Sequence, residues 1–383
     1  MKIGLLLPRS DAHPGVGLDF MNGLKGFLKQ QELNTQIQFF SENIGFGAVE
    51  KEVYEKAEKL LIIDDADILV AYIDEKVLTV LRPLLNASGK LMIVVNPGAN
   101  YPLEWALQPN IINLTLQHAF LCWLTGASAG KVENANALMA TTFYDCGYLH
   151  TAAMVKNFVK AGGNITFNYV NNQRYDDTFH VNELTGFLSA NKDTNNLLCA
   201  FDDLPAALLY KQLNQFEHAE RLHLFVSPMM LEQKALQNLQ QGFRFSVRGY
   251  VPWLASMENE ANKKFTDCYS RQTKRPAGIF SLLGWETGML LEQIFVHSKA
   301  SYADGAAIAQ TLTKIKIDSP RGLLQLDTAT HYYLSPAGKF VIKSGTSAMK
   351  PEWISDYENE WKAFVKEPTT GLASGWTNTY LCY

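Results

Sequence analysis

Segments typical of buried strands alternate with segments typical of helices from the first residues of the chain. Short apolar runs suit strands that are buried on both faces of a sheet, and they lie at 2–8, 35–40, 66–73 and 90–95. Between the first two runs, apolar residues recur at helical spacing, namely Leu18, Met21, Leu24, Phe27 and Leu28. This β-α-β-α order predicts a mostly parallel sheet covered by helices.

The alternation breaks near residue 118 and then restarts. A long helix-like segment at 116–130 and a polar stretch at 131–136 separate the first series of strands and helices from a second series. Further helix-like segments and a block of short strands and turns at 318–345 follow the second series. We therefore predict two α/β units, and the elements after the second unit indicate that the chain returns to the first.

Length and composition agree with a folded protein of two or three domains. The chain has 383 residues, of which 47% are hydrophobic and 19% are charged, and its formal net charge is -4. This balance argues against a disordered chain, and it gives no basic excess that would indicate a nucleic-acid-binding protein. The apolar runs are far shorter than the ~20 residues that a membrane helix needs.

The segment "MKIGLLLP" at 1–8 has too short an apolar run for a signal peptide, which needs ~7–15 apolar residues. We interpret it as the first buried strand. The protein is then cytoplasmic if Met1 is the native start, or periplasmic (more generally extracytoplasmic) if a signal peptide was removed. The cysteines at 122, 146, 199, 268 and 382 include no C-x-x-C pair, and at least one thiol is unpaired in the monomer.

Two glycine motifs are weak signals for chemistry. In "IGFGAVE", Glu50 stands where a dinucleotide fingerprint needs a third glycine, so Gly45 and Gly47 are expected to serve a turn. In "GASAG", Ser128 follows a helix-like segment and not a strand, so we interpret these glycines as helix caps and not as a nucleophile elbow. The eight histidines show no metal-ligand spacing, and neither a metal nor a cofactor is predicted.

Polar and small residues follow the predicted strands. Because parallel sheets place their ligands at the carboxyl ends of the strands, candidate ligand contacts lie at 9–17, 72–75, 96–100, 144–147, 202–204 and 227–230. Tyr72 and Leu204 are among them. Asp202 ends a buried strand, where it either faces a site or caps the next helix. No catalytic pair emerges, and these groups are the inventory of a binding site.

Several segments, in order along the chain, resemble one family. "KLMIVVNPGANYPLEW" is similar to the strand and small-residue loop of the branched-chain amino-acid-binding proteins, which are the type I periplasmic binding proteins of ABC importers. "KIGLLLP" with "GLDFMNGLK" resembles their opening strand and helix. "ATTFYDCGYLHTAAMVKNFVKAGGNI" resembles their strand, turn and helix in the second lobe. "FSLLGWETGMLLEQIF" and "DSPRGLLQLD" resemble their late helix and closing turn.

The resemblance implies a fold of two Rossmann-like α/β lobes, with parallel sheets flanked by helices and a three-crossing hinge between them. It places lobe 1 at 1–117 plus 252–328 and lobe 2 at 118–248 plus 332–383. The crossings are expected near 116–119, 247–252 and 327–333.

The resemblance also implies roles for individual residues. The loop that holds the ligand carboxylate falls at Gly98, Ala99 and Asn100, and the tyrosine of the second lobe falls at Tyr144. Val16 stands where some members place a tryptophan over the ligand side chain.

Two positions depart from the family pattern. The family serine that helps to hold the carboxylate falls at Glu75, which would repel it, and the glutamate that pairs with the ligand ammonium falls at Met229. Leucine or isoleucine held in the usual manner is therefore in doubt. Asp202 becomes the candidate partner of an ammonium group.

These observations predict a solute-binding protein and not an enzyme. Its ligand would be a small polar molecule, such as an amino acid or a related amide or carboxylate, trapped between two lobes and delivered to an ABC permease in the membrane. The alternatives are a sensory ligand-binding module of the same fold and, less favoured, a hydrolase that uses Ser128. The sequence does not separate transport from sensing.

Overall fold

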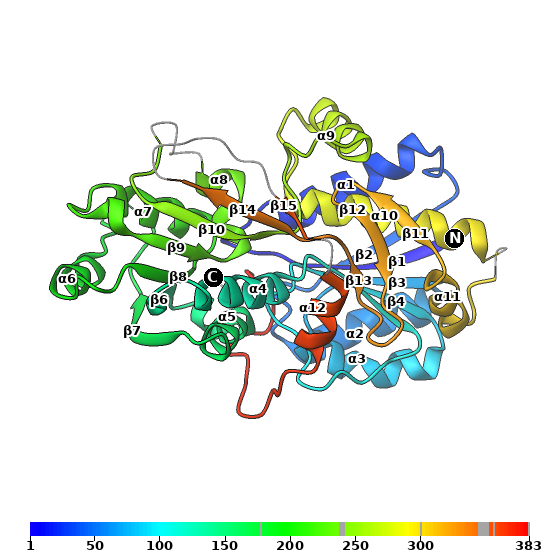
Figure 1. The fold of residues 1–383 in the computed structure, drawn as a ribbon. Coiled ribbons are helices and arrows are strands. Elements are labelled where there is room, and N and C mark those ends of the chain that lie inside the picture. The colour runs from blue at the N-terminus through cyan, green and yellow to red at the C-terminus, as the bar shows by residue number, and fades with distance from the viewer. Residues whose placement is uncertain (177, 237–241, 299–300, 344–351, 355–356, 382–383) are drawn as a thin grey trace. The chain divides into compact units, whose positions relative to one another are not determined.

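The chain forms two compact units in a computed structural model (Figure 1). The structure describes all residues except 177, 237–241, 299–300, 344–351, 355–356 and 382–383. Unit 1 comprises Met1–Leu116, Trp253–Pro336 and Thr377–Tyr383, and unit 2 comprises Gln117–Pro252 and Ala337–Trp376. The chain therefore passes between the units after residues 116, 252, 336 and 376. The bounds of the two lobes that move about the hinge stay a prediction. Residues 377–383, which were predicted to belong to lobe 2, are grouped with unit 1 by their contacts.

Unit 1 is built on a parallel sheet, with helices and a small antiparallel sheet added from the later chain. Its elements are β1 (Lys2–Leu7), α1 (Val16–Gln30), β2 (Gln38–Asn43), α2 (Glu50–Glu58), a π-helix (Lys59–Ile63), β3 (Ile68–Tyr72), α3 (Glu75–Ser88), β4 (Leu91–Asn96), β5 (Ile111–Thr115), α9 (Glu260–Thr273), α10 (Ile279–His297), α11 (Gly305–Leu312), β11 (Lys316–Ser319), β12 (Gly322–Leu326) and β13 (Tyr333–Leu334).

The five strands of the main sheet of unit 1 lie in the order β2-β1-β3-β4-β5, and every pair is parallel. All residues of β3 and β4 are buried, as their continuous apolar runs predict. β2 lies at the edge and consists of exposed and half-buried residues. Its second half is polar, so the apolar pattern predicted the strand three residues too early. The parallel order brings the carboxyl ends of β1, β2, β3 and β4 to one edge of the sheet.

A buried ion pair fixes the small antiparallel sheet β11-β12-β13 to unit 1. Arg321, in the turn between β11 and β12, donates from Nε to both carboxylate oxygens of Glu286 on α10, at 2.9 and 3.1 Å. Ser319 donates to the same carboxylate at 2.6 Å, and Arg321 Nη1 donates to the carbonyl of Thr115 at the end of β5. Both charged side chains are fully buried, so removal of either one would leave an unpaired charge in the interior.

Unit 2 is a second α/β unit with a larger sheet. Its elements are α4 (His118–Gly130), β6 (Asn136–Thr142), a 3₁₀ turn (Asp145–Gly147), α5 (Leu149–Lys160), β7 (Asn164–Asn171), α6 (Asn182–Ala190), β8 (Asn196–Ala200), α7 (Asp203–Asn214), a 3₁₀ turn (Ala219–Arg221), β9 (His223–Val226), a 3₁₀ turn (Pro228–Leu231), α8 (Gln233–Leu236), β10 (Ser246–Val251), β14 (Gly338–Ile342), β15 (Glu352–Trp353) and α12 (Tyr357–Val365). The strand order is β15-β14-β10-β9-β8-β6-β7, parallel from β10 to β7 and antiparallel at β14 and β15.

Glycines bring one helix pair into close contact in each unit. A Cβ on Gly23 of α1 would lie 2.0 Å from the carbonyl oxygen of Ser281 in α10, and a Cβ on Gly126 of α4 would lie 2.0 Å from that of Met154 in α5. The interpretation of the "GASAG" glycines as caps is therefore wrong for Gly126, which lies inside α4. Ser128 also lies inside this helix and not on the strand-to-helix turn of a nucleophile elbow.

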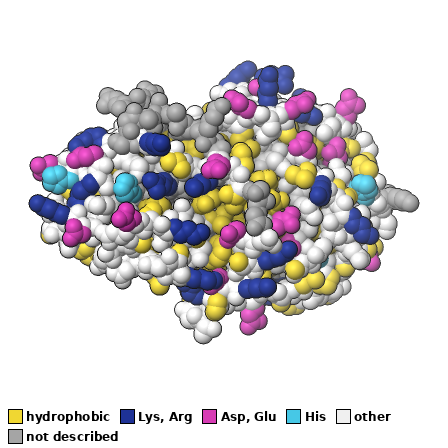
Figure 2. Space-filling view, viewed as in Figure 1, with side chains coloured by type: hydrophobic (Ala, Val, Ile, Leu, Met, Phe, Trp, Pro, Cys, Tyr) yellow, Lys and Arg dark blue, Asp and Glu magenta, His cyan; other side chains and the backbone are white. Residues whose placement is uncertain are grey.

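The surface and the most apolar helix both fit a globular protein. Figure 2 shows cationic and anionic side chains interspersed on the face drawn, in keeping with the small net charge. Among the described residues, α10 is the one helix long and apolar enough to cross a membrane, but 67% of its most apolar stretch is buried within the protein. It is a core helix of unit 1. Cys122, Cys146, Cys199 and Cys268 are free thiols, and Cys382 lies outside the described residues.

Candidate functional site

The predicted carboxylate loop of unit 1 follows β4 directly. Gly98 has a φ of +79°, a left-handed conformation that glycine adopts without strain. Ala99 is fully buried, and Asn100 donates from Nδ2 to the carboxylate Oδ2 of Asp74 at 3.0 Å. The loop therefore has the small residues and the backbone turn that close approach of a ligand requires, and its amide side chain is turned toward a buried acid of the neighbouring strand end.

Asp74 is the centre of the hydrogen bonds at this edge of unit 1, and sequence reasoning did not single it out. Its carboxylate accepts from the backbone N–H and the hydroxyl of Thr379, both at 2.7 Å, while its own backbone N–H donates to Asn378 Oδ1 at 2.8 Å. All of these bonds lie within unit 1. Burial raises the pKa of Asp74 to about 6, against the lowering effect of the bonds from Thr379 and Asn100.

Glu75, the position predicted to repel a carboxylate, begins α3 and forms an ion pair with Arg82 of the same helix. Burial raises the pKa of Glu75 to about 7, and Arg82 opposes that shift. The charge of Glu75 is therefore partly neutralised, and the expected repulsion of an anionic ligand is weakened.

Tyr72 and Val16 both lie in buried positions of unit 1. Tyr72 ends β3, packs its ring edge-to-face with Phe20 at a centroid distance of 6.1 Å, and keeps its hydroxyl without a hydrogen bond among the described residues. Val16 begins α1 and is buried, so it offers an apolar surface but no ring. Tyr72 and Glu75 follow the end of β3, and the Gly98 loop follows β4. Because β3 and β4 are parallel neighbours, these residues lie at one edge of the sheet.

The predicted tyrosine of unit 2 belongs to an aromatic cluster. Tyr144 follows β6, and its ring lies 5.4 Å from the ring of Trp376 and 5.5 Å from that of Phe143. Trp376 also donates from Nε1 to the carbonyl oxygen of Tyr144 at 2.8 Å. Phe143 is half exposed, which leaves apolar aromatic surface at the strand ends of unit 2.

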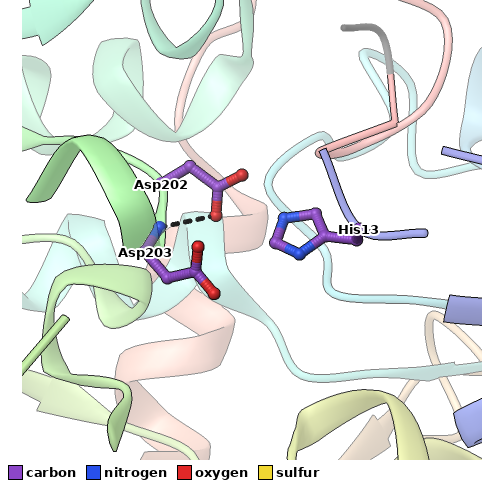
Figure 3. Close-up of side chains that lie close together, drawn as sticks. All are labelled: His13, Asp202 and Asp203. Carbon is purple, nitrogen blue, oxygen red and sulfur yellow. Dashed lines mark hydrogen bonds between the residues drawn. The ribbon is translucent and has the colours of Figure 1, made fainter. Parts of the chain in front are cut away.

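Asp202 takes the capping role that the sequence left open. Its side chain accepts from the backbone N–H of Asp203 at 2.7 Å and caps α7, as Figure 3 shows. Its own N–H donates to Asp145 at 3.0 Å, and Asp145 also accepts from the hydroxyl of Thr142 at 2.6 Å. The imidazole of His150 is buried, and burial lowers its pKa to about 3, although the charge of Asp202 opposes this shift. Pairing of Asp202 with a ligand stays a prediction.

The remaining candidates of unit 2 differ in exposure. Met229 is buried in the 3₁₀ turn after β9, and Leu204 is 53% exposed in the first turn of α7. Asp203, next to Leu204, forms an ion pair with Lys234 at 3.0 Å. The roles of Met229 and Leu204 in ligand binding stay predictions.

The C-terminal segment is the element that sequence reasoning missed. After α12 the described chain continues to residue 381 without a regular element, and its polar residues bind the strand ends just described. The local sequence "GWTNTYL" has no apolar period that predicts a fixed place. The sequence signals for this segment are two glycines outside it, Gly47 and Gly147. A Cβ at these positions would lie 2.0 Å from Asn378 and 2.2 Å from Trp376.

Comparison with known proteins places the chain within a family. The model of the periplasmic binding protein family matches residues 1–345. No curated protein matches the sequence.

Three solved structures illustrate the similarity of fold. A solute-binding protein of an ABC transporter from R. palustris in complex with benzoate is 18% identical, with a TM-score of 0.72 over 93% of this chain and 97% of the other. An ABC transporter substrate-binding protein from Sphaerobacter thermophilus is 14% identical, with a TM-score of 0.75 over 92% and 96%. The branched-chain amino acid transporter substrate-binding protein LivJ from Streptococcus pneumoniae, in complex with isoleucine, is 13% identical, with a TM-score of 0.68 over 92% and 99%.

Proposed function

The chain belongs to the periplasmic binding protein family, and from this premise we propose that it binds a small carboxylate outside the cytoplasm for an ABC importer. This family consists of solute-binding proteins and not of enzymes. The observation that carries the choice of ligand is the loop after β4, where Gly98 turns the backbone with a positive φ and Ala99 adds no bulk. Backbone N–H groups of such a loop can approach an anion closely.

Two classes of carboxylate are candidate ligands. The aromatic cluster of Phe143 and Tyr144 offers apolar surface to an aromatic acid, and benzoate is the ligand of one structural relative. Isoleucine is the ligand of another relative, but here Met229 replaces the family glutamate, and Asp202 would have to meet the ammonium group. A permease of an ABC transporter is the expected partner of either form.

Ligand binding would act through a hinge. A ligand that contacts both lobes favours the closed state by its differential affinity for the two states. Small-angle scattering with a saturating ligand should then give a smaller radius of gyration. An unchanged radius for a ligand that demonstrably binds would argue against closure.

Mass spectrometry of small molecules released by denaturing the purified protein tests the ligand class directly. We expect a carboxylate, and the unfolding temperature should rise when that compound is added back, since a ligand at 100 times its Kd adds ~2.7 kcal/mol to the stability. Benzoate, 4-hydroxybenzoate, leucine and isoleucine form the starting panel. A released ligand without a carboxylate would overturn the proposal.

Gly98→Val tests the loop. The branched side chain crowds the approach to the backbone and strains a left-handed residue, so binding should be lost. Gly45→Val is the matched control, because Gly45 also has a positive φ of +58° but an added Cβ would meet nothing within 4 Å. Normal binding by Gly98→Val would show that the loop is only a turn.

A further inference from the structure

The C-terminal segment makes contacts of the kind that a bound peptide makes. Asn378 and Thr379 are buried, and together they give Asp74 two donors and one acceptor. Asn378 also donates from Nδ2 to the carbonyl oxygen of Phe46 at 2.8 Å. The side chains and backbone of two successive residues thus satisfy groups from two separate strand-end loops of unit 1, with no regular structure of their own.

The segment packs closely against one loop of unit 1, and polar atoms near it remain without partners. A Cβ on Gly47, whose φ is +70°, would lie 2.0 Å from Asn378 Nδ2. The carboxylate oxygen Oδ1 of Asp74 and the hydroxyl of Tyr72 are buried and have no partner among the described residues. Buried polar atoms without partners are costly, so this edge is built to receive more hydrogen bonds than the segment supplies.

We propose that the strand ends of unit 1 form a peptide-binding site around Asp74, and that the chain's own residues 378–380 are its resident ligand. The site recognises an extended peptide or amide that offers N–H and O–H donors to the carboxylate and a carbonyl oxygen to the N–H of Asp74. The pKa of Asp74, raised to about 6, agrees with a carboxylate that is short of cationic partners. If the proposed function holds, a solute reaches this edge only after the segment has left it.

Unit 2 holds the preceding residues by different contacts. Gly375 donates from its N–H to the carbonyl oxygen of Gly147 at 2.8 Å, and Trp376 donates to Tyr144. We call the contacts of Gly375 and Trp376 the anchor in unit 2, and those of Asn378 and Thr379 the anchor in unit 1. Only Thr377 lies between the two anchors in the sequence. Two residues span at most ~7 Å, so a segment released from one set of contacts stays tethered close to the other.

Amide hydrogen exchange on the full chain tests whether Asp74 holds the segment. In the double variant Asn378→Ala/Thr379→Ala, amides of 378–381 should exchange at least tenfold faster than in the wild type. Thr377→Ala is the control, because the Thr377 side chain makes no hydrogen bond to another described residue, and this variant should leave exchange unchanged. If the double variant fails to fold, Thr379→Val replaces it in the test. This variant keeps the shape of the side chain and loses only the hydroxyl, so the exchange rates of 378–381 should rise by a smaller factor.

A labelled peptide with the sequence of residues 374–381, SGWTNTYL, tests whether the site binds in trans. Fluorescence anisotropy should show saturable binding to the double variant, at least tenfold weaker binding when Asp74→Ala is added, and weaker binding to the wild type, whose site is occupied. A scrambled peptide should not bind.

The outcomes separate the two proposals. Unchanged exchange in the double variant would show that Asp74 does not hold the segment, and faster exchange without binding of the peptide would show that the segment is only a part of the fold. Either result overturns the inference. No solute is used, so the proposal of carboxylate binding stands or falls by its own test.

Discussion

Each unit binds its own part of the C-terminal segment at the carboxyl ends of its strands, but by different chemistry. In unit 1 a buried carboxylate, a backbone N–H and a backbone carbonyl bind Asn378 and Thr379. In unit 2 two aromatic rings and two carbonyl oxygens bind the residues before them, chiefly Trp376. One anchor is charged and directional, and the other is apolar and broad.

The difference shows how one edge geometry can serve two kinds of recognition. Hydrogen bonds to a buried carboxylate demand donors at fixed positions and depend on its protonation. Packing between aromatic rings tolerates small shifts and does not titrate near neutral pH. We therefore expect the anchor in unit 1 to be sensitive to substitution and pH, and the anchor in unit 2 to tolerate conservative changes.

Asp74→Ala should give the largest effect. It leaves the N–H and hydroxyl of Thr379 and the amide of Asn100 without their buried acceptor, which should lower the free energy of unfolding by ~3–5 kcal/mol. Chemical denaturation followed by circular dichroism measures it. Thr370→Ala, in the same tail but in the part held by unit 2, is the control. A loss below ~1 kcal/mol would remove the distinction between the two anchors.

Gly47→Ala should cost ~2 kcal/mol more than Gly45→Ala. Both glycines have a positive φ, so both variants strain the backbone, but only the Cβ at residue 47 meets the side chain of Asn378. The difference between the two unfolding free energies isolates the collision with the segment. Equal values would mean that Asn378 moves aside without cost.

The stability of the wild type relative to Asp74→Asn should depend on pH. The folded protein has a pKa of about 6 at Asp74, above the value of ~3.9 in the unfolded chain, so between these values the folded state binds more protons. The contribution of Asp74 is therefore full below pH ~4 and is lost as the pH rises through 6. We expect the difference in unfolding free energy to fall by ~2 kcal/mol from pH 4 to pH 7.5, and a flat difference would contradict the raised pKa.

Trp376→Phe should give the smallest effect. It keeps a ring against Phe143 and Tyr144 and loses one hydrogen bond to a backbone carbonyl, which is worth ~1 kcal/mol. Hydrogen exchange of 374–377 should rise less than tenfold. Trp376→Ala removes the ring as well and provides the upper limit. If phenylalanine were as harmful as alanine, the anchor in unit 2 would also depend on a directional bond.

The main sheets could be predicted from the sequence because their strands are buried on both faces. β3 and β4 are continuous apolar runs, and such runs need no knowledge of their neighbours. β2 is half exposed, so its polar end was left out of the prediction. The ordered family segments supplied the two-lobed fold, which the match to the family model confirms.

The candidate site could be predicted only in part, because its contacts depend on distant residues. The strand ends were visible as polar residues after apolar runs, and they include the loop at Gly98 and Tyr144. Two partners of Asp74, Asn378 and Thr379, lie 304 and 305 residues away in a segment without a pattern. Likewise, Gly126 looked like a cap because its true neighbour, the backbone of α5, cannot be seen from α4 alone.

The separation between Asp74 and Thr379 also sets an order of events during synthesis. Extending the chain by 305 residues, from Asp74 to Thr379, takes a ribosome roughly 15 to 60 s, at ~5–20 residues per second. Through that interval the nascent first unit carries an acid whose burial has no matching donors from the tail. The strand that ends before Asp74 is therefore made long before the donors of Thr379, and a chain truncated before residue 379 lacks these donors.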